Sequence, residues 1–113
     1  MTVYALAQFT IEDRERYERY ARRFAGSLTG FDGRLLAADE TPTMIEGTAE
    51  IDKVVLIAFP DRGEFERWAT SSTYREISKD RTAATSGTVL LVTGVDSHAD
   101  STGVSPTIPP APR

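Results

Sequence analysis

Arg81 is the side chain whose place in the sequence points most directly to chemistry. It follows Tyr74 and Ile77 at helical spacing and shares one face with them, where an apolar residue is expected. A guanidinium there can bind a carboxylate or an enolate through two parallel hydrogen bonds. Alternatively, it extends to the surface, complements the helix dipole, or pairs with Glu46 or Asp13. We treat Arg81 as a candidate anion-binding catalytic residue.

Glu46 and His98 are the candidates for moving protons. Glu46 lies at the end of a predicted apolar arm. A partly buried carboxylate there would have a raised pKa and could act as general acid or base. The structural alternative is that Glu46 is a structural partner of Arg34 or Arg81. His98 is the only histidine, and its unperturbed pKa of about 6.5 suits proton transfer.

Aromatic side chains would form the walls of a site for a ring-shaped ligand. Trp68 offers a flat apolar surface and an N–H donor. Tyr17, Tyr20 and Tyr74 could point their hydroxyls into the same cavity. Arg34 is the remaining candidate for contact with a substrate. For each aromatic residue the structural alternative is that it fills the hydrophobic core.

Two helical regions must position most of these side chains. The first follows a cap signal at Thr10 or Asp13, and its apolar residues recur at helical spacing. The second is broken in two: a short helix begins after a capping box at Asp61, and a further helix runs from 73 to 85 and ends at Gly87. The apolar stripe of the first helix consists of Tyr17, Tyr20, Ala21, Phe24 and Leu28.

The apolar runs between the helices predict the strands, at residues 3–9, 34–38, 53–59 and 88–95, with a short strand arm at 43–46. The resulting order, β-α-β-β-α-β, is typical of the ferredoxin-like α+β fold, an antiparallel sheet with helices on one face. We expect one domain over residues 1–96. Four prolines in the last eight residues predict a flexible Pro-rich tail over 97–113.

The predicted strands are apolar on both faces. From Val54 to Phe59 both alternating sets of side chains are apolar, although the strands of a sheet covered on one face should alternate apolar with polar residues. The uncovered face would exceed the roughly 300–600 Å² of apolar patch that monomers typically show. A second copy packed sheet against sheet is the simplest cover, so we expect a two-fold symmetric homodimer.

The composition excludes several classes of protein. The chain has 113 residues, a net charge of −4 and no cysteine, which excludes disulfides, thiolate zinc sites and iron–sulfur clusters. Glycine-rich phosphate loops and metal-hydrolase motifs are missing, so we expect no cofactor and no metal. Arginines interleaved with acids argue against nucleic-acid binding. No apolar run approaches the ~20 residues of a membrane span, and without a basic leader we expect a cytoplasmic location.

A set of individually weak motifs between residues 3 and 96 carries a family resemblance: Asp13, Tyr17, Tyr20, Asp32-Gly33-Arg34, Glu46-Gly47, the run from Val54 to Pro60, Trp68, Ser71, Tyr74, Arg81, Val92 and Gly94-Val95. With this set the chain resembles the uncharacterised dimeric α/β-barrel family known as domain of unknown function 1330. It departs from the family pattern at Asp32, where glycine is usual, and at Ala58, where glutamate is usual. The resemblance implies a barrel-like dimer whose wider relatives include cofactor-independent monooxygenases, isomerases, polyketide cyclases and haem enzymes.

These observations together lead us to expect a cofactor-independent enzyme. It would isomerise, cyclise or oxygenate an aromatic or polyketide-like metabolite, with Arg81 holding an oxyanion and Glu46 or His98 moving protons. Two alternatives stay open. In the first, the protein is a homodimer that binds a small molecule without turnover. In the second, it is a scaffold whose cavity is filled by its own side chains.

Overall fold

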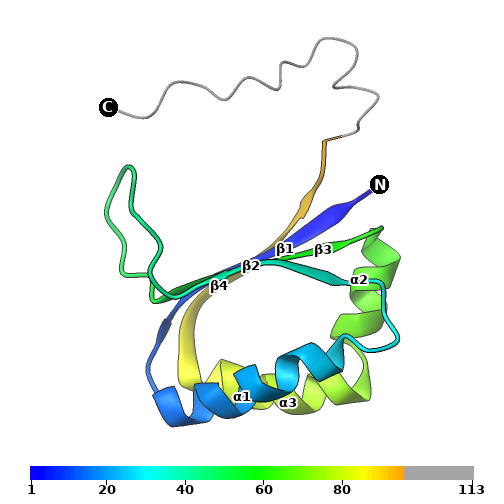
Figure 1. Ribbon diagram of the computed structural model, residues 1–113, viewed down its shortest axis with the longest axis horizontal. Helices are drawn as coiled ribbons and strands as arrows, with labels where there is room; N and C mark the ends of the chain where they lie inside the picture. Colours follow the sequence, from blue (N-terminus) through cyan, green and yellow to red (C-terminus); the bar gives the residue numbers. More distant parts are fainter. Residues whose placement is uncertain (96–113) are drawn as a thin grey trace.

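The computed structural model describes residues 1–95 as two layers, a four-stranded antiparallel sheet and three helices that cover one of its faces (Figure 1). The strands lie side by side in the order β2-β3-β1-β4. Their bounds are β1 Val3–Ile11, β2 Arg34–Asp39, β3 Lys53–Phe59 and β4 Thr85–Thr93. The helices are α1 Arg14–Ser27, α2 Arg62–Ala69 and α3 Ser72–Ala84. The predicted ferredoxin-like α+β fold is confirmed.

Each helix begins at a polar side chain that caps it. Asp13 Oδ1 accepts a hydrogen bond from the backbone N–H of Arg16 at 3.0 Å, which decides between the two predicted caps because Thr10 lies within β1. Asp61 and Ser71 cap α2 and α3 in the same way. These bonds satisfy N–H groups that have no partner inside the helix, and they fix where each helix leaves the sheet.

The start of β4 differs from the prediction. The helix before it ends at Ala84 and β4 begins at Thr85, not at residue 88. Gly87 does not end the helix but lies inside β4, opposite Phe9 of β1. A Cβ on Gly87 would come within 2.6 Å of the Phe9 Cα, so the glycine permits the close approach of two strands. A glycine shortly after a helix more often ends that helix, which is why the sequence predicts this role for Gly87.

The connection from residue 40 to 52 also differs from the prediction. The sequence predicts a strand arm at 43–46, but within residues 1–95 that segment pairs with no strand. β2 is the edge strand and pairs only with β3, and residues 43–46 do not add a strand to its open edge within residues 1–95. Instead the connection rises from the sheet on the side away from the helices (Figure 1). Met44 and Ile45 are exposed on it.

The hydrophobic core lies between the sheet and the helices. Tyr17, Phe59 and Ile77 are almost completely buried there. The predicted α1 stripe and the predicted face of α3 both point into this layer, as their spacing indicated. Trp68 of α2 joins them with 3% of its surface exposed. The aromatic side chains of all three helices therefore meet above the sheet.

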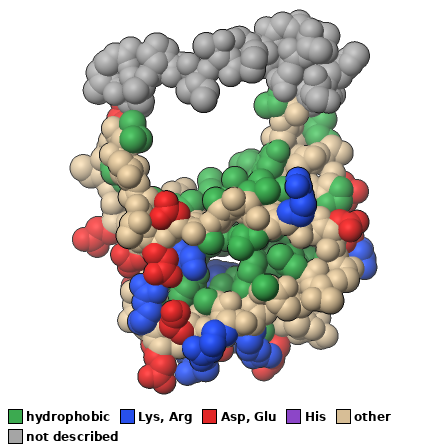
Figure 2. Space-filling view, viewed as in Figure 1, with side chains coloured by type: hydrophobic (Ala, Val, Ile, Leu, Met, Phe, Trp, Pro, Cys, Tyr) green, Lys and Arg blue, Asp and Glu red, His purple; other side chains and the backbone are tan. Residues whose placement is uncertain are grey.

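The opposite face of the sheet is apolar and uncovered in the described part of one subunit. Strand pairing places Leu56, Leu6 and Leu90 side by side across β3, β1 and β4. Leu90 and Val92 are 47% and 42% exposed. Hydrophobic side chains are visible along this side of the sheet in Figure 2. Because the strands are apolar on both faces, as predicted, one apolar face of the sheet stays exposed to solvent in this part of a single subunit.

None of the helices over residues 1–95 is long and apolar enough to cross a membrane.

Candidate functional site

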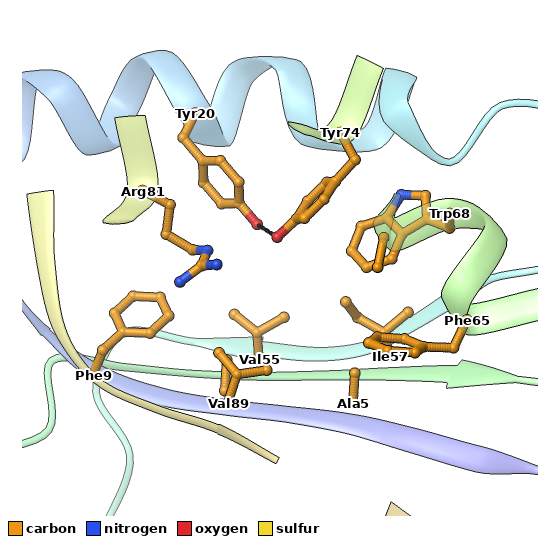
Figure 3. A pocket seen from close by; sticks show the side chains of 12 residues that line it. Ala5, Phe9, Tyr20, Val55, Ile57, Phe65, Trp68, Tyr74, Arg81 and Val89 are labelled. Carbon is orange, nitrogen blue, oxygen red and sulfur yellow. Dashed lines mark hydrogen bonds between the residues drawn. The ribbon is translucent and has the colours of Figure 1, made fainter. Parts of the chain in front are cut away.

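A cavity of about 180 Å³ lies between the sheet and the helices (Figure 3). The sheet contributes small or branched side chains, among them Ala5, Val55 and Ile57. The helices contribute the larger side chains: Tyr20, Phe65, Trp68, Tyr74 and Arg81. A mainly apolar lining with a few polar groups is typical of small-molecule sites.

The polar groups of the cavity converge at one place. The hydroxyls of Tyr20, from α1, and Tyr74, from α3, are 3.2 Å apart and hydrogen-bonded. The guanidinium carbon of Arg81, on the same face of α3 as Tyr74, lies 5.9 Å from the centre of the Tyr20 ring. All three side chains point into the cavity in Figure 3. Arg81 is the only charged side chain that lines it among residues 1–95.

The protonation states of these groups follow from their burial. Burial raises the pKa of the Tyr20 hydroxyl well above its usual range, and the neighbouring Tyr74 raises it further. Tyr20 is therefore a neutral hydrogen-bond donor. Burial lowers the pKa of the Arg81 guanidinium, but Tyr74 and Tyr20 more than offset this, so its pKa is raised and its charge is kept. One cation and the neutral Tyr20 hydroxyl facing an apolar space favour a negatively charged oxygen there.

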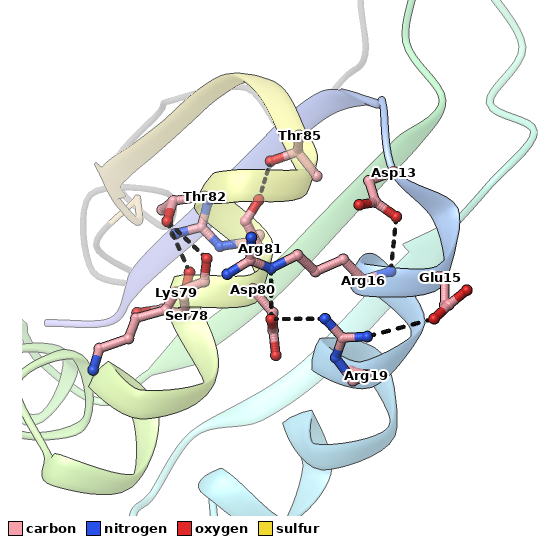
Figure 4. Close-up of polar contacts among 10 residues, drawn as sticks. All are labelled: Asp13, Glu15, Arg16, Arg19, Ser78, Lys79, Asp80, Arg81, Thr82 and Thr85. Carbon is pink, nitrogen blue, oxygen red and sulfur yellow. Dashed lines mark hydrogen bonds and ion pairs between the residues drawn. The ribbon is translucent and has the colours of Figure 1, made fainter.

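Ion pairs between α1 and α3 join the two helices next to Arg81 (Figure 4). Asp80 Oδ1 accepts a hydrogen bond from Arg16 Nε at 2.7 Å and lies 3.5 Å from an Arg19 nitrogen. The hydrogen bond from Arg16 lowers the pKa of the Asp80 carboxyl, so the ion pair persists at neutral pH. Because Asp80 directly precedes Arg81, the pair aligns the turn of α3 that carries the cavity's cation.

The indole of Trp68 is held in place by a buried hydrogen-bond chain. Its Nε1–H donates to Ser27 Oγ at 3.2 Å, and that hydroxyl donates to the carbonyl of Phe24 at 2.6 Å. The Trp68 ring centre lies 3.9 Å from that of Tyr74. Ser27 is not among the predicted site residues. Its position three residues after Phe24, on the apolar face of α1, is the feature of the sequence that indicates its burial.

Replacing Ser27 by alanine is expected to destabilise the protein by about 1–3 kcal/mol, because the buried indole N–H loses its acceptor. Chemical denaturation followed by tryptophan fluorescence measures this change. The matched control is Ser78→Ala, since Ser78 donates to the Arg75 carbonyl in the same way but is only partly buried. Equal stability changes in the two variants would contradict a role for Ser27 in holding Trp68.

Comparison with known proteins places the chain in a family. A family model described as a domain of unknown function (DUF1330) matches residues 2–95. The chain belongs to this family. A protein of unknown function from Rhodopseudomonas palustris, RPA0582, has a similar structure, with a TM-score of 0.73 and 18% identity over 84% of this chain and 83% of that one.

Two further structures share the fold of this DUF1330 chain. SnoaB, a cofactor-independent oxygenase from Streptomyces nogalater, has a TM-score of 0.58 and 16% identity over 84% of this chain and 94% of its own. A dabb family protein with a ferredoxin-like fold from Mesorhizobium loti has a TM-score of 0.61 and 11% identity, over 84% and 98%. No curated protein matches the chain. At these identities the likeness shows the fold alone.

The structure brings four of the predicted site residues together and separates others. Four of them line the cavity: Tyr20, Trp68, Tyr74 and Arg81. Tyr17 is 1% exposed and packs beside Tyr20, with ring centres 5.7 Å apart. Phe9, Val55 and Phe65 also line the cavity and were not predicted, because each looks like ordinary core in the sequence.

Two of the predicted site residues, Arg34 and Glu46, do not line this cavity. Arg34 is exposed on β2 and lines a separate surface pocket. That pocket also holds Asp32 and Ala58, the two positions that depart from the family pattern. The expected partial burial of Glu46 is not found: its side chain is exposed, because the connection 40–52 extends away from the helices. His98 and the predicted tail lie outside the described residues.

Proposed function

We propose that this DUF1330 protein binds a small aromatic or polyketide-like molecule and stabilises an oxyanion on it during cofactor-independent proton transfer. The observation that carries the proposal is the convergence of Arg81 with the hydrogen-bonded hydroxyls of Tyr20 and Tyr74 in an otherwise apolar, aromatic cavity. Trp68 would contact the ring of the ligand, and Arg81 would pair with its acidic oxygen.

Such a site would favour the enolate of a carbonyl compound. When a proton leaves the carbon beside the carbonyl, the electron pair of the C–H bond moves onto the oxygen, where Arg81 and a tyrosine hydroxyl hold the charge. Return of the proton to a different carbon gives an isomer. Attack of the carbanionic carbon on a second carbonyl of the same molecule forms a C–C bond and gives a cyclised product. With dioxygen as co-substrate, the carbanion would instead pass one electron to O2, and recombination of the two radicals would form a C–O bond. Protonation of this peroxide and loss of water would leave one oxygen atom on the product as a carbonyl.

The proton itself must go to a base, and we propose Glu46 and His98 for this role. A carboxylate and an imidazole are the side chains that most often accept protons near neutral pH. Among residues 1–95, neither a carboxylate nor an imidazole lines the cavity. Glu46 would therefore act only after a movement of the connection 40–52 or from a second copy. Loss of turnover in Glu46→Gln, with unchanged ligand affinity, is the result that supports it.

Replacing Arg81 by glutamine is expected to remove the oxyanion stabilisation. The probe is para-nitrophenol, whose phenolate absorbs visible light and so reports its own ionisation. A positive charge close to the phenol should lower its pKa on binding by about one to three units. This shift should be lost in Arg81→Gln, whereas the exposed Arg75→Gln on the same helix should retain it. An unshifted probe pKa in the wild-type protein would overturn the proposal.

Because neither a carboxylate nor an imidazole of residues 1–95 lines the cavity, a second candidate function is a binding protein that holds an aromatic anion without turnover. That function predicts ligand-dependent thermal shifts and no product. A scaffold without a ligand predicts instead that Arg81→Gln costs stability, about 1–3 kcal/mol where a buried partner loses its bond, and that no aromatic anion binds. Thermal melting of wild type and variant, with and without para-nitrophenol, separates the three.

We also propose that the protein is a homodimer through the uncovered faces of its sheets. The apolar row of Leu56, Leu6 and Leu90 supports this proposal, because no part of residues 1–95 covers it. The exposed Met44 and Ile45 lie on the connection that rises on the same side. Covering several hundred Å² per subunit contributes on the order of 10 kcal/mol before the costs of association.

A further inference from the structure

A second cavity lies beside the first, between α1 and the strands β2 and β3. Its volume is about 160 Å³, and it shares Tyr20 and Val55 with the first cavity. Tyr20 comes from the helix layer and Val55 from the sheet, and Figure 3 shows the two facing each other across open space. Figure 2 shows the molecule hollowed between the same two layers. The two cavities are therefore neighbours that meet at one pair of side chains.

Each of the two cavities has one cation in its lining. Lys53 of β3 lines the second cavity, and its Nζ lies 4.9 Å from the centre of the Tyr17 ring. Tyr17 and Tyr20 follow each other on α1 with ring centres 5.7 Å apart. Arg81 lies 5.9 Å from the Tyr20 ring on the other side. Two positive charges thus flank a row of two tyrosine rings, and both face the space under α1.

Lys53 is largely buried, and its ion pair is long. Its side chain is only 13% exposed, which is low for a lysine. Its carboxylate neighbour is Glu40, with an Nζ–Oε2 distance of 3.6 Å, and Glu40 is itself shared with Arg14 at 3.3 Å. The distance of 3.6 Å between Lys53 and Glu40 is longer than a direct hydrogen bond. An oxygen inside the second cavity would give the ammonium a closer acceptor.

We propose that the two cavities form one elongated site, in which Lys53 binds the end of the ligand opposite Arg81. This inference rests on the proposed function, in which the first cavity binds an aromatic anion. Each cavity alone is smaller than the roughly 300 Å³ at the lower end of known ligand sites, whereas together they reach that size. The substrate class is therefore a linearly extended aromatic molecule with an acidic or carbonyl oxygen at both ends.

Calorimetric titration with three naphthalene acids tests the elongated site. The probes are 2-naphthoate, with one acid group, naphthalene-2,6-dicarboxylate, with groups at opposite ends, and naphthalene-2,3-dicarboxylate, with both groups at one end. Lys53→Gln should weaken binding of the 2,6 isomer about tenfold, the effect of losing one charge-assisted hydrogen bond. The same variant should leave the other two probes within about twofold. Lys79 is an exposed lysine of α3. The control variant Lys79→Gln should not change the affinity for any of the three probes.

A second variant tests the same site without changing a charge. Ala21 lines only the second cavity, so Ala21→Leu should fill it and weaken the 2,6 isomer selectively. If 2-naphthoate binds in an Arg81-dependent way but neither variant affects the 2,6 isomer, the elongated site is wrong and the proposed function stands. If 2-naphthoate and both diacids fail to bind the wild-type protein, the proposed function fails, and the elongated site fails with it.

Discussion

Leu90→Glu is expected to convert the protein from a dimer into a monomer. Leu90 lies in β4 opposite Leu6 on the uncovered face of the sheet, and 47% of its surface is exposed in one subunit. In a sheet-to-sheet dimer it would be buried. An ionised carboxylate without a partner in that interface costs several kcal/mol. Two-fold symmetry brings a second copy of the same charge to the interface, which adds repulsion.

The fold of the single subunit should survive the Leu90→Glu change, because the new side chain projects into solvent there. Light scattering at micromolar concentration should give 12.4 kDa for the variant and about twice that mass for the wild type. Leu90→Met, which keeps the apolar surface, and Thr82→Glu, which adds the same charge at an exposed position of α3, should both remain dimeric. A wild-type particle of 12.4 kDa at that concentration would overturn the proposed dimer and its apolar interface.

Trp68→Ala is expected to lower the free energy of unfolding by about 3–5 kcal/mol, the range for removing a large buried aromatic side chain. Only 3% of Trp68 is exposed. Its ring centre lies 5.3 Å from that of Phe59 and 3.9 Å from that of Tyr74. The change also removes the donor to Ser27. No other single side chain joins α1, α2, α3 and the sheet through ring contacts and a hydrogen bond among residues 1–95.

Urea denaturation followed by circular dichroism measures this loss, at one protein concentration because a dimer's stability depends on it. Trp68→Phe is the matched control: it keeps a ring but loses the N–H donor, so it should cost less than alanine. The same series reports on the cavity, since only the alanine variant should lose the ring contact to a bound aromatic anion. A loss below about 1 kcal/mol for Trp68→Ala would contradict the packing argument.

Much of the fold could be predicted because its signals are local. The apolar spacing of Tyr17, Tyr20 and Phe24 predicts the buried face of α1, and the structure confirms it. Asp61 predicts the start of α2 for the same kind of reason, since a cap acts within one helical turn. The apolar run 53–59 predicts β3 with the observed bounds. These features depend on neighbours in the sequence.

The predictions from the sequence are wrong where a segment distant in the sequence decides the structure. Gly87 has the sequence context of a helix terminator, but the approach of Phe9 from β1 makes it a residue of a strand. The segment 43–46 has the composition of a strand but pairs with no strand in the part of the chain that the structure describes. Glu46 was expected to be partly buried, and the path of the connection 40–52 leaves it exposed.

The sequence by itself determined the order of the helices and strands, the chemistry of the candidate residues and the two apolar faces of the sheet. All of these follow from periodicity and side-chain type. Only the tertiary structure decided which side chains share a cavity: Arg81 meets Tyr20 although 61 residues separate them, and Lys53 meets Tyr17. The physical reason is that such contacts depend on how α1 packs on α3 and on the sheet, which is a sum of many weak contacts across the chain.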